Sequence, residues 1–229
     1  MKKTEIVFVL DRSTSMHSIA QKAVDGFNAF LKEQQKNPKG KRLTLLQFDN
    51  KLEYIYKSKK ISKCIPLVNG ETYVIQGWTA LLDAIGTAVH SVWNAKNVIL
   101  AVYTDGYENS SQEFTTKNIK KILKRATKKG WETIFLAAEV DTIYFTHTLN
   151  INPNKVARVR KGDFLNTMTT VSSYTSDYAI SASPSANMLQ ADIDDDVSKE
   201  SGGGNSNKVR AVKINNPDVT PTNTANATA

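Results

Sequence analysis

The stretch "IVFVLDRSTSM" (residues 6–16) decides the fold of this chain. Its first five residues are apolar and run directly into Asp11, Ser13 and Ser15, and a periodic apolar pattern resumes at Ile19. A short continuous apolar run predicts a strand that is buried on both faces of a sheet. The predicted strand therefore ends in one carboxylate and two hydroxyls, spaced two residues apart.

The rest of the chain alternates between short apolar runs and stretches with helical periodicity. Two strand-like runs flank Asn50, which predicts a hairpin. This order predicts an α/β fold: a Rossmann-like, open and mostly parallel central sheet with one antiparallel edge strand and helices on both faces. The expected strands are residues 4–10, 42–49, 52–57, 97–104, 132–138 and 155–160, and the expected helices are residues 17–35, 81–92, 116–129, 142–149 and 163–179.

The composition predicts one domain and an appendage. The 229 residues are 40% hydrophobic and 23% charged, which is enough to bury a sizeable core. Residues 1–180 are expected to form the domain. Residues 181–229 are small, polar and glycine-rich, so they are expected to form a flexible tail. Within this tail, residues 208–214 alternate well enough to form a docked strand.

No feature of the sequence predicts a membrane segment. No apolar run approaches the ~20 residues that a membrane helix needs, and Glu5 and Asp11 leave the first apolar stretch too short for a secretory signal. Cys64 is the single cysteine, so it cannot form an internal disulfide and is expected to be a packing residue in a reducing compartment. We therefore expect a cytoplasmic protein.

The net charge of +8 permits binding to nucleic acid, anionic surfaces or acidic proteins. Basic residues concentrate in residues 57–63 and 117–129. In the second stretch, Ile119, Ile122 and Leu123 have the spacing of an apolar helix face, which leaves the lysines on the outer side. This helix is read either as a solvated face or as a surface for nucleic acid or another anion.

Polar residues in two later segments complement the first cluster. Thr79 lies in "GWTALLDAI" at the start of a predicted helix, and Asp105 lies in "VYTDGYENS" directly after a predicted strand. In open parallel sheets, ligands bind beyond the carboxyl ends of the strands, where several loops converge. Hydroxyl and carboxylate oxygens suit a hard cation such as Mg²⁺ or Mn²⁺. Together with Asp11, Ser13 and Ser15, these residues form a candidate metal site.

The three motifs together, D-x-S-x-S at 11–15, a helix-opening Thr79 and T-D-G at 104–106, resemble the metal-ion-dependent adhesion site of the von Willebrand factor type A (vWA) family. The sequence around these motifs is similar to that of a bacterial and bacteriophage branch of the family, and the resemblance covers residues 4–180. Position 14 is often glycine in this branch and is threonine here.

The resemblance implies roles for the five residues and a mode of recognition. Ser13 and Ser15 would bind Mg²⁺ or Mn²⁺ directly, Thr79 directly or through water, and Asp11 and Asp105 often through water. An exposed Asp or Glu of a partner protein would complete the coordination. If the chain is phage-encoded, this would take place in the host cytoplasm. The partner-binding rim would comprise Arg12, Thr14, Met16, Trp78, Tyr107 and Glu108.

Two other functions compete with this interpretation. A metal-dependent phosphohydrolase could use Asp11 as its nucleophile, but the second carboxylate that such chemistry wants two residues later is replaced by Ser13. The sequence also has no glycine-rich phosphate loop. We therefore expect a protein that is not an enzyme. Binding of nucleic acid or of an anionic surface through the basic helix, residues 117–129, remains the main alternative.

Overall fold

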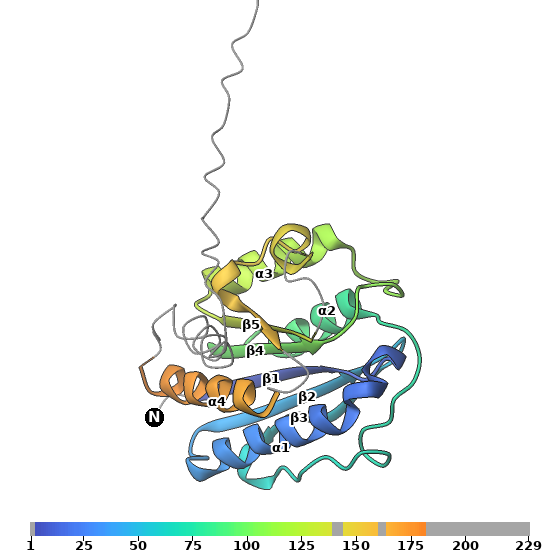
Figure 1. The fold of residues 1–229 in the computed structure, drawn as a ribbon. Helices are drawn as coiled ribbons and strands as arrows, with labels where there is room; N and C mark the ends of the chain where they lie inside the picture. The colour runs from blue at the N-terminus through green and yellow to red at the C-terminus, as the bar shows by residue number, and fades with distance from the viewer. Residues whose placement is uncertain (1–2, 139–143, 160–163, 182–229) are drawn as a thin grey trace, which may run out of the picture.

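A six-stranded sheet forms the centre of the fold in the computed structural model, which describes residues 3–138, 144–159 and 164–181 (Figure 1). The strands are β1 (Thr4–Asp11), β2 (Lys41–Phe48), β3 (Leu52–Lys60), β4 (Asn97–Thr104), β5 (Glu132–Ala138) and β6 (Val156–Val159). Their order across the sheet is β3-β2-β1-β4-β5-β6. All neighbours pair in parallel except β2 and β3, which form an antiparallel hairpin at one edge. The predicted mostly parallel sheet is confirmed.

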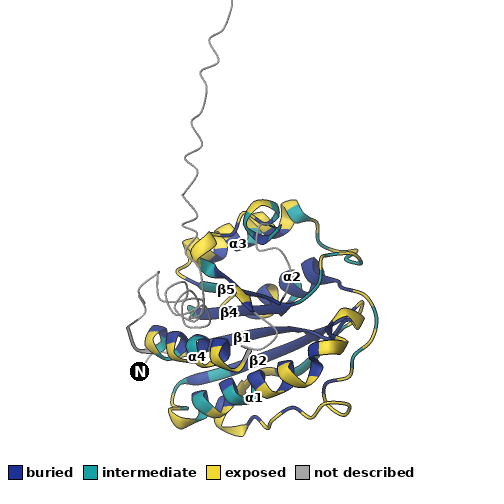
Figure 2. Ribbon diagram, viewed as in Figure 1, coloured by how far each residue is buried: buried dark blue, intermediate teal, exposed yellow. Residues whose placement is uncertain are grey.

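Strand β1 lies in the middle of the sheet and supplies both hydrophobic cores. Because side chains alternate along a strand, Ile6 and Phe8 pack into the core on one face, and Val7 and Val9 pack into the core on the other. All four side chains are fully buried, and β1 has the colour of buried residues in Figure 2. The continuous apolar run of the sequence is therefore explained by burial on both sides.

Helices cover both faces of the sheet. The α-helices are α1 (Ala20–Lys36), α2 (Leu81–Ser91), α3 (Thr116–Lys128) and α4 (Phe164–Ser181). Helices α1 and α4 pack on one face, and α2 and α3 pack on the other (Figure 1). On the first face, the ring of Phe8 lies 5.3 Å from that of Phe27 and 5.6 Å from that of Phe30, measured between centroids.

Short helical turns occupy several of the connections. They are the 3-10 helices η1 (Thr14–Ile19), η2 (Ile61–Lys63) and η4 (Pro153–Lys155) and the π-helix η3 (Tyr144–Thr148). Among the helices of the described residues, none has the length and the apolar character that a membrane span requires.

Three expectations differ from the structure or fall partly outside it. The helix expected over 17–35 is divided into η1 and α1, and the helix expected over 142–149 is a π-helix in its described part. The tighter 3-10 turn contains Met16, whose side chain is fully buried. The expected tail, including the strand at 208–214, lies outside the described residues except for Ser181, which ends α4.

Candidate metal centre

The carboxyl ends of β1 and β4 bring the D-x-S-x-S and T-D-G motifs together. The strands are parallel neighbours, with Leu10 opposite Tyr103, so the residues that follow emerge side by side. The Thr104 hydroxyl donates a hydrogen bond of 2.5 Å to Asp11 Oδ2. The Ser15 hydroxyl donates one of 2.6 Å to Asp105 Oδ1. Residues 90 positions apart in the chain therefore share one polar cluster.

The loop after β1 is organised around the carboxylate of Asp11. Its Oδ1 atom accepts a 2.7 Å hydrogen bond from the backbone N–H of Ser13, which closes a tight turn of the Asx type. This turn brings Ser13 Oγ and Ser15 Oγ within 3.0 Å of each other. The Ser15 hydroxyl also contacts the Asp105 carboxylate, so both serine hydroxyls belong to the same polar cluster.

Thr79 comes from a third loop and reaches the same cluster beside Gly106. A β-carbon added to Gly106 would lie 3.0 Å from Thr79 Oγ1 and 3.3 Å from Ser15 Oγ. The glycine of T-D-G thus allows the backbone to approach both hydroxyls closely. The loop is held by Asn109, whose Oδ1 accepts a 2.8 Å hydrogen bond from Thr79 N and whose N–H donates a 3.0 Å bond to Thr79 O.

Burial gives Asp11 an unusual protonation equilibrium. The side chain is fully buried, and this loss of solvation raises the pKa of its carboxyl group from 3.8 to about 7. Hydrogen bonds from Thr104 and Ser13 oppose the rise, and the nearby charge of Asp105 adds to it. A bound cation would favour the ionised carboxylate and so relieve this cost.

The donor set fits a hard divalent cation. Three hydroxyls and two carboxylates provide only oxygen atoms, which Mg²⁺ and Mn²⁺ prefer. Ser15 is exposed and Asp105 is partly exposed, so the cluster opens to solvent. Within 3–138, 144–159 and 164–181, no group of three or more His, Cys, Asp or Glu side chains is placed to hold a metal. The candidate site instead combines two carboxylates with three hydroxyls.

Two of the six predicted rim residues are buried instead of exposed. Arg12 donates from Nε to Asp49 Oδ2 at 2.8 Å and from Nη1 to Glu53 Oε2 at 2.5 Å, which ties the end of β1 to the β2–β3 hairpin. Met16 is fully buried and belongs to the core beneath α1. The loop after β1 directs both side chains inward, Arg12 to the carboxylates of Asp49 and Glu53 and Met16 into the core.

The other four rim residues divide into exposed and structural ones. Trp78 is 69% exposed and Tyr107 is 51% exposed, an unusual exposure for large aromatic side chains. Thr14 is exposed, and its hydroxyl donates to Gly77 O at 2.8 Å. The Glu108 carboxylate accepts hydrogen bonds from the backbone N–H group of Leu82, in the first turn of α2, and from those of Ser110 and Ser111. Glu108 therefore supports the loop.

Sequence reasoning missed several residues that position the cluster. Thr104 opens the T-D-G motif, and its hydroxyl donates to Asp11 Oδ2. The Tyr73 hydroxyl donates to Asp11 O at 2.5 Å from a loop 62 residues away. The Asp83 carboxylate accepts from the backbone N–H groups of residues 112–114. The motif itself could have indicated Thr104, whereas no local pattern indicates a contact such as that of Tyr73.

The chain is similar to a known domain family. A model of the von Willebrand factor type A domain matches residues 5–173. No curated protein matches the chain. The vWF domain of the type V pili tip protein Mfa5 from Porphyromonas gingivalis has a TM-score of 0.60 and 11% identity, over 80% of this chain and 98% of that one.

Two further solved structures share the fold over part of their length. Proximal thread matrix protein 1 from the mussel byssus has a TM-score of 0.53 at 18% identity, over 75% of this chain and 45% of that one. The pilus adhesin SpaC from Lactobacillus rhamnosus GG has a TM-score of 0.59 at 13% identity, over 76% of this chain and 30% of that one. The chain thus spans less than half of these two proteins. At such low identity, the likeness shows the fold.

Proposed function

Because the chain belongs to the von Willebrand factor type A domain family, we propose that it is a divalent-metal-dependent protein-interaction module. Domains of this family typically mediate protein–protein interactions. One observation carries the proposal: Ser13, Ser15 and Asp105 form a continuous polar chain, with contacts of 3.0 Å and 2.6 Å, at the meeting point of two loops. Thr79 joins this chain from a third loop beside Gly106.

Each of the five residues would have a role in binding Mg²⁺ or Mn²⁺. The Ser13 and Ser15 hydroxyls are the direct ligands, and Thr79 binds directly or through water. Asp11 and Asp105 act mainly by orienting the hydroxyls, and the hydrogen bonds from Ser13 N to Asp11 and from Ser15 to Asp105 support this role. When bound, the ion supplies a positive charge that neutral hydroxyls leave largely uncompensated.

The partner in this proposal is a protein that presents an exposed Asp or Glu. A carboxylate from outside would complete the coordination of the ion. Trp78 and Tyr107 are exposed and come from the same two loops as Thr79 and Asp105, so they are the side chains best placed to contact the partner. Aromatic residues of this kind contribute strongly to protein interfaces.

A non-catalytic role is part of the proposal. Asp11 is fully buried, and both of its carboxylate oxygens accept hydrogen bonds. These contacts leave it poorly placed to attack a phosphate from solvent, which argues against the phosphohydrolase alternative. We also propose a cytoplasmic location, because Cys64 is buried and unpaired. Membership of the bacterial and bacteriophage branch rests on the likeness of the motifs.

Affinity capture tests the proposal. The immobilised chain is expected to retain a partner in Mg²⁺ and to release it on addition of EDTA, and Ser15→Ala should abolish retention. Ser18→Ala is the matched control, because Ser18 is an exposed serine of the same 3-10 helix as Ser15. A partner that stays bound in EDTA, or that the two variants retain equally, would contradict metal-dependent recognition.

A further inference from the structure

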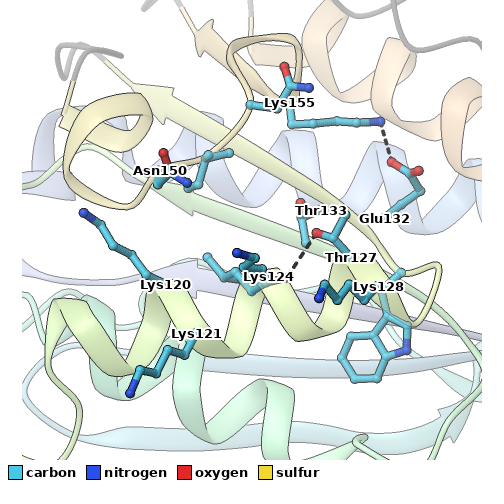
Figure 3. A pocket seen from close by; sticks show the side chains of 13 residues that line it. Lys120, Lys121, Lys124, Thr127, Lys128, Glu132, Thr133, Asn150 and Lys155 are labelled. Atoms are coloured by element: carbon cyan, nitrogen blue, oxygen red, sulfur yellow. Dashed lines mark hydrogen bonds and ion pairs between the residues drawn. The ribbon is translucent and has the colours of Figure 1, made fainter.

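A cavity of about 470 Å³ lies between α3, the start of β5 and the segment that leads into β6 (Figure 3). Glu132 and Thr133, the first residues of β5, form part of its wall. The candidate metal centre instead follows the last residues of β1 and β4. Because β5 runs parallel to β4, the cavity lies toward the opposite end of the sheet. We call it the lysine cavity.

Positive charge gathers on one wall of the lysine cavity. Lys120, Lys124 and Lys128 recur every four residues, so they lie on one side of α3. Figure 3 shows these side chains along the helix, beside the segment that carries Asn150. All three are exposed, and within the described part of the chain none forms an ion pair. Their charges are thus available to a ligand.

Among the described residues that line the lysine cavity, the one carboxylate, that of Glu132, is already neutralised. Glu132 Oε2 accepts from Lys155 Nζ at 2.5 Å and from the Tyr174 hydroxyl at 2.8 Å. Lys155 is held by the same contacts, since its Nζ also lies 2.7 Å from the Tyr174 oxygen. The pair contributes little net charge, so the α3 lysines that line the cavity set its electrostatic character. They are Lys120, Lys124 and Lys128, with Lys121 beside them.

The remaining wall is partly apolar. Leu123, Trp131 and Ile151 line the cavity and are each at least nine-tenths buried. Thr133 and Asn150 add polar atoms near them. The volume falls within the range of about 300–1,000 Å³ that is typical of small-molecule sites, which combine apolar walls with a few polar groups.

These features favour a compact anion over a nucleic-acid strand. Binding of single strands relies on exposed aromatic side chains on which bases stack. Among the described residues that line the cavity, the one aromatic side chain is Trp131, which is 3% exposed. Lysine ammonium groups bind phosphate oxygens as point charges, and three of them gathered at one wall match a ligand with several negative charges.

We propose that the lysine cavity binds a small organic phosphate that carries at least two negative charges. The phosphate lies against Lys120, Lys124 and Lys128, and the organic part lies against Leu123 and Ile151. This site is separate from the metal centre and needs no divalent ion.

Calorimetric titration of the full chain in metal-free buffer at low salt tests the proposal. The probes are adenosine diphosphate, inorganic pyrophosphate, uncharged adenosine and an oligothymidine. We expect adenosine diphosphate to bind most tightly and adenosine not to bind. Lys124→Glu should weaken binding of the diphosphate by about tenfold or more. Ser15→Ala should leave it unchanged, which separates this site from the metal centre.

Lys117→Glu is the matched control, because Lys117 is an exposed lysine of α3 that does not line the cavity. It changes the net charge by the same amount as Lys124→Glu. Equal losses in the two variants would show a diffuse charge effect and would overturn the proposal. It would also be overturned if neither phosphate bound the chain, or if an oligothymidine bound with a steep salt dependence while pyrophosphate did not.

Discussion

Replacing Asp11 by Asn should stabilise the metal-free protein and weaken its response to Mg²⁺. Asn has nearly the same shape and can keep both contacts of Asp11: its oxygen accepts from Ser13 N, and its amide donates to the Thr104 hydroxyl, which then acts as the acceptor. The substitution removes the charge whose burial raises the pKa of the carboxyl group to about 7. The two expected effects have opposite signs, which distinguishes them from a general loss of stability.

The magnitude follows from proton linkage. The pKa of Asp11 is higher in the folded state, about 7, than its ordinary value of 3.8. The folded state therefore binds more protons between these values, and the stability of the metal-free protein decreases as the pH rises through this window. At about pH 8 the ionised, buried carboxylate costs on the order of 4 kcal/mol. For a domain of this size, that free energy corresponds to a Tm difference of roughly 10 °C.

Thermal melts of the two proteins between about pH 5 and about pH 8, with and without saturating Mg²⁺, measure this effect. Without metal, the Tm of the native sequence should fall below that of Asp11→Asn as the pH rises. With Mg²⁺, the Tm of the native sequence should rise again and the Tm of the variant should change little. The reason is that an ion stabilises only a folded protein that binds it. A metal-free variant that is less stable than the native sequence at the alkaline end would refute this reasoning.

Three further substitutions test other parts of the structure. Gly106→Ala should reduce the increase in Tm produced by Mg²⁺, because its β-carbon would crowd Thr79 Oγ1 at 3.0 Å and Ser15 Oγ at 3.3 Å. Arg12→Ala should lower the free energy of unfolding in urea by about 3 kcal/mol or more, since it leaves Asp49 buried without its partner; a change below about 1 kcal/mol would contradict this. Trp78→Ala should leave the melting temperature unchanged and weaken partner capture, because the side chain is 69% exposed; undiminished capture would remove Trp78 from the interface.

The sheet could be predicted because its signal is local. The run of apolar residues 6–10 is typical of a strand that is buried on both faces. In the structure, its side chains divide between the two cores. The hairpin around Asn50 and the amphipathic pattern of residues 116–129 are equally local. The end of each element was less predictable, because capping and tight turns depend on contacts such as that of Thr14 with Gly77.

The site was only partly predictable, and Arg12 and Met16 show why. The motifs predicted that the five oxygen-bearing residues lie close together, because the loops that follow parallel strands converge at one edge of the sheet. Whether a residue between them faces solvent depends on distant partners. Arg12 is drawn inward by Asp49 and Glu53, which lie 37 and 41 positions away in the chain. The sequence around residue 12 does not indicate such long-range contacts.

Direct titration with Mn²⁺, followed by electron paramagnetic resonance, tests the central claim most directly. The native chain should bind a single ion, Ser13→Ala and Ser15→Ala should each lose most of the affinity, and Ser18→Ala should behave like the native chain. Absence of Mn²⁺ binding to the native chain, or equal binding by all four proteins, would contradict a metal centre at the ends of β1 and β4.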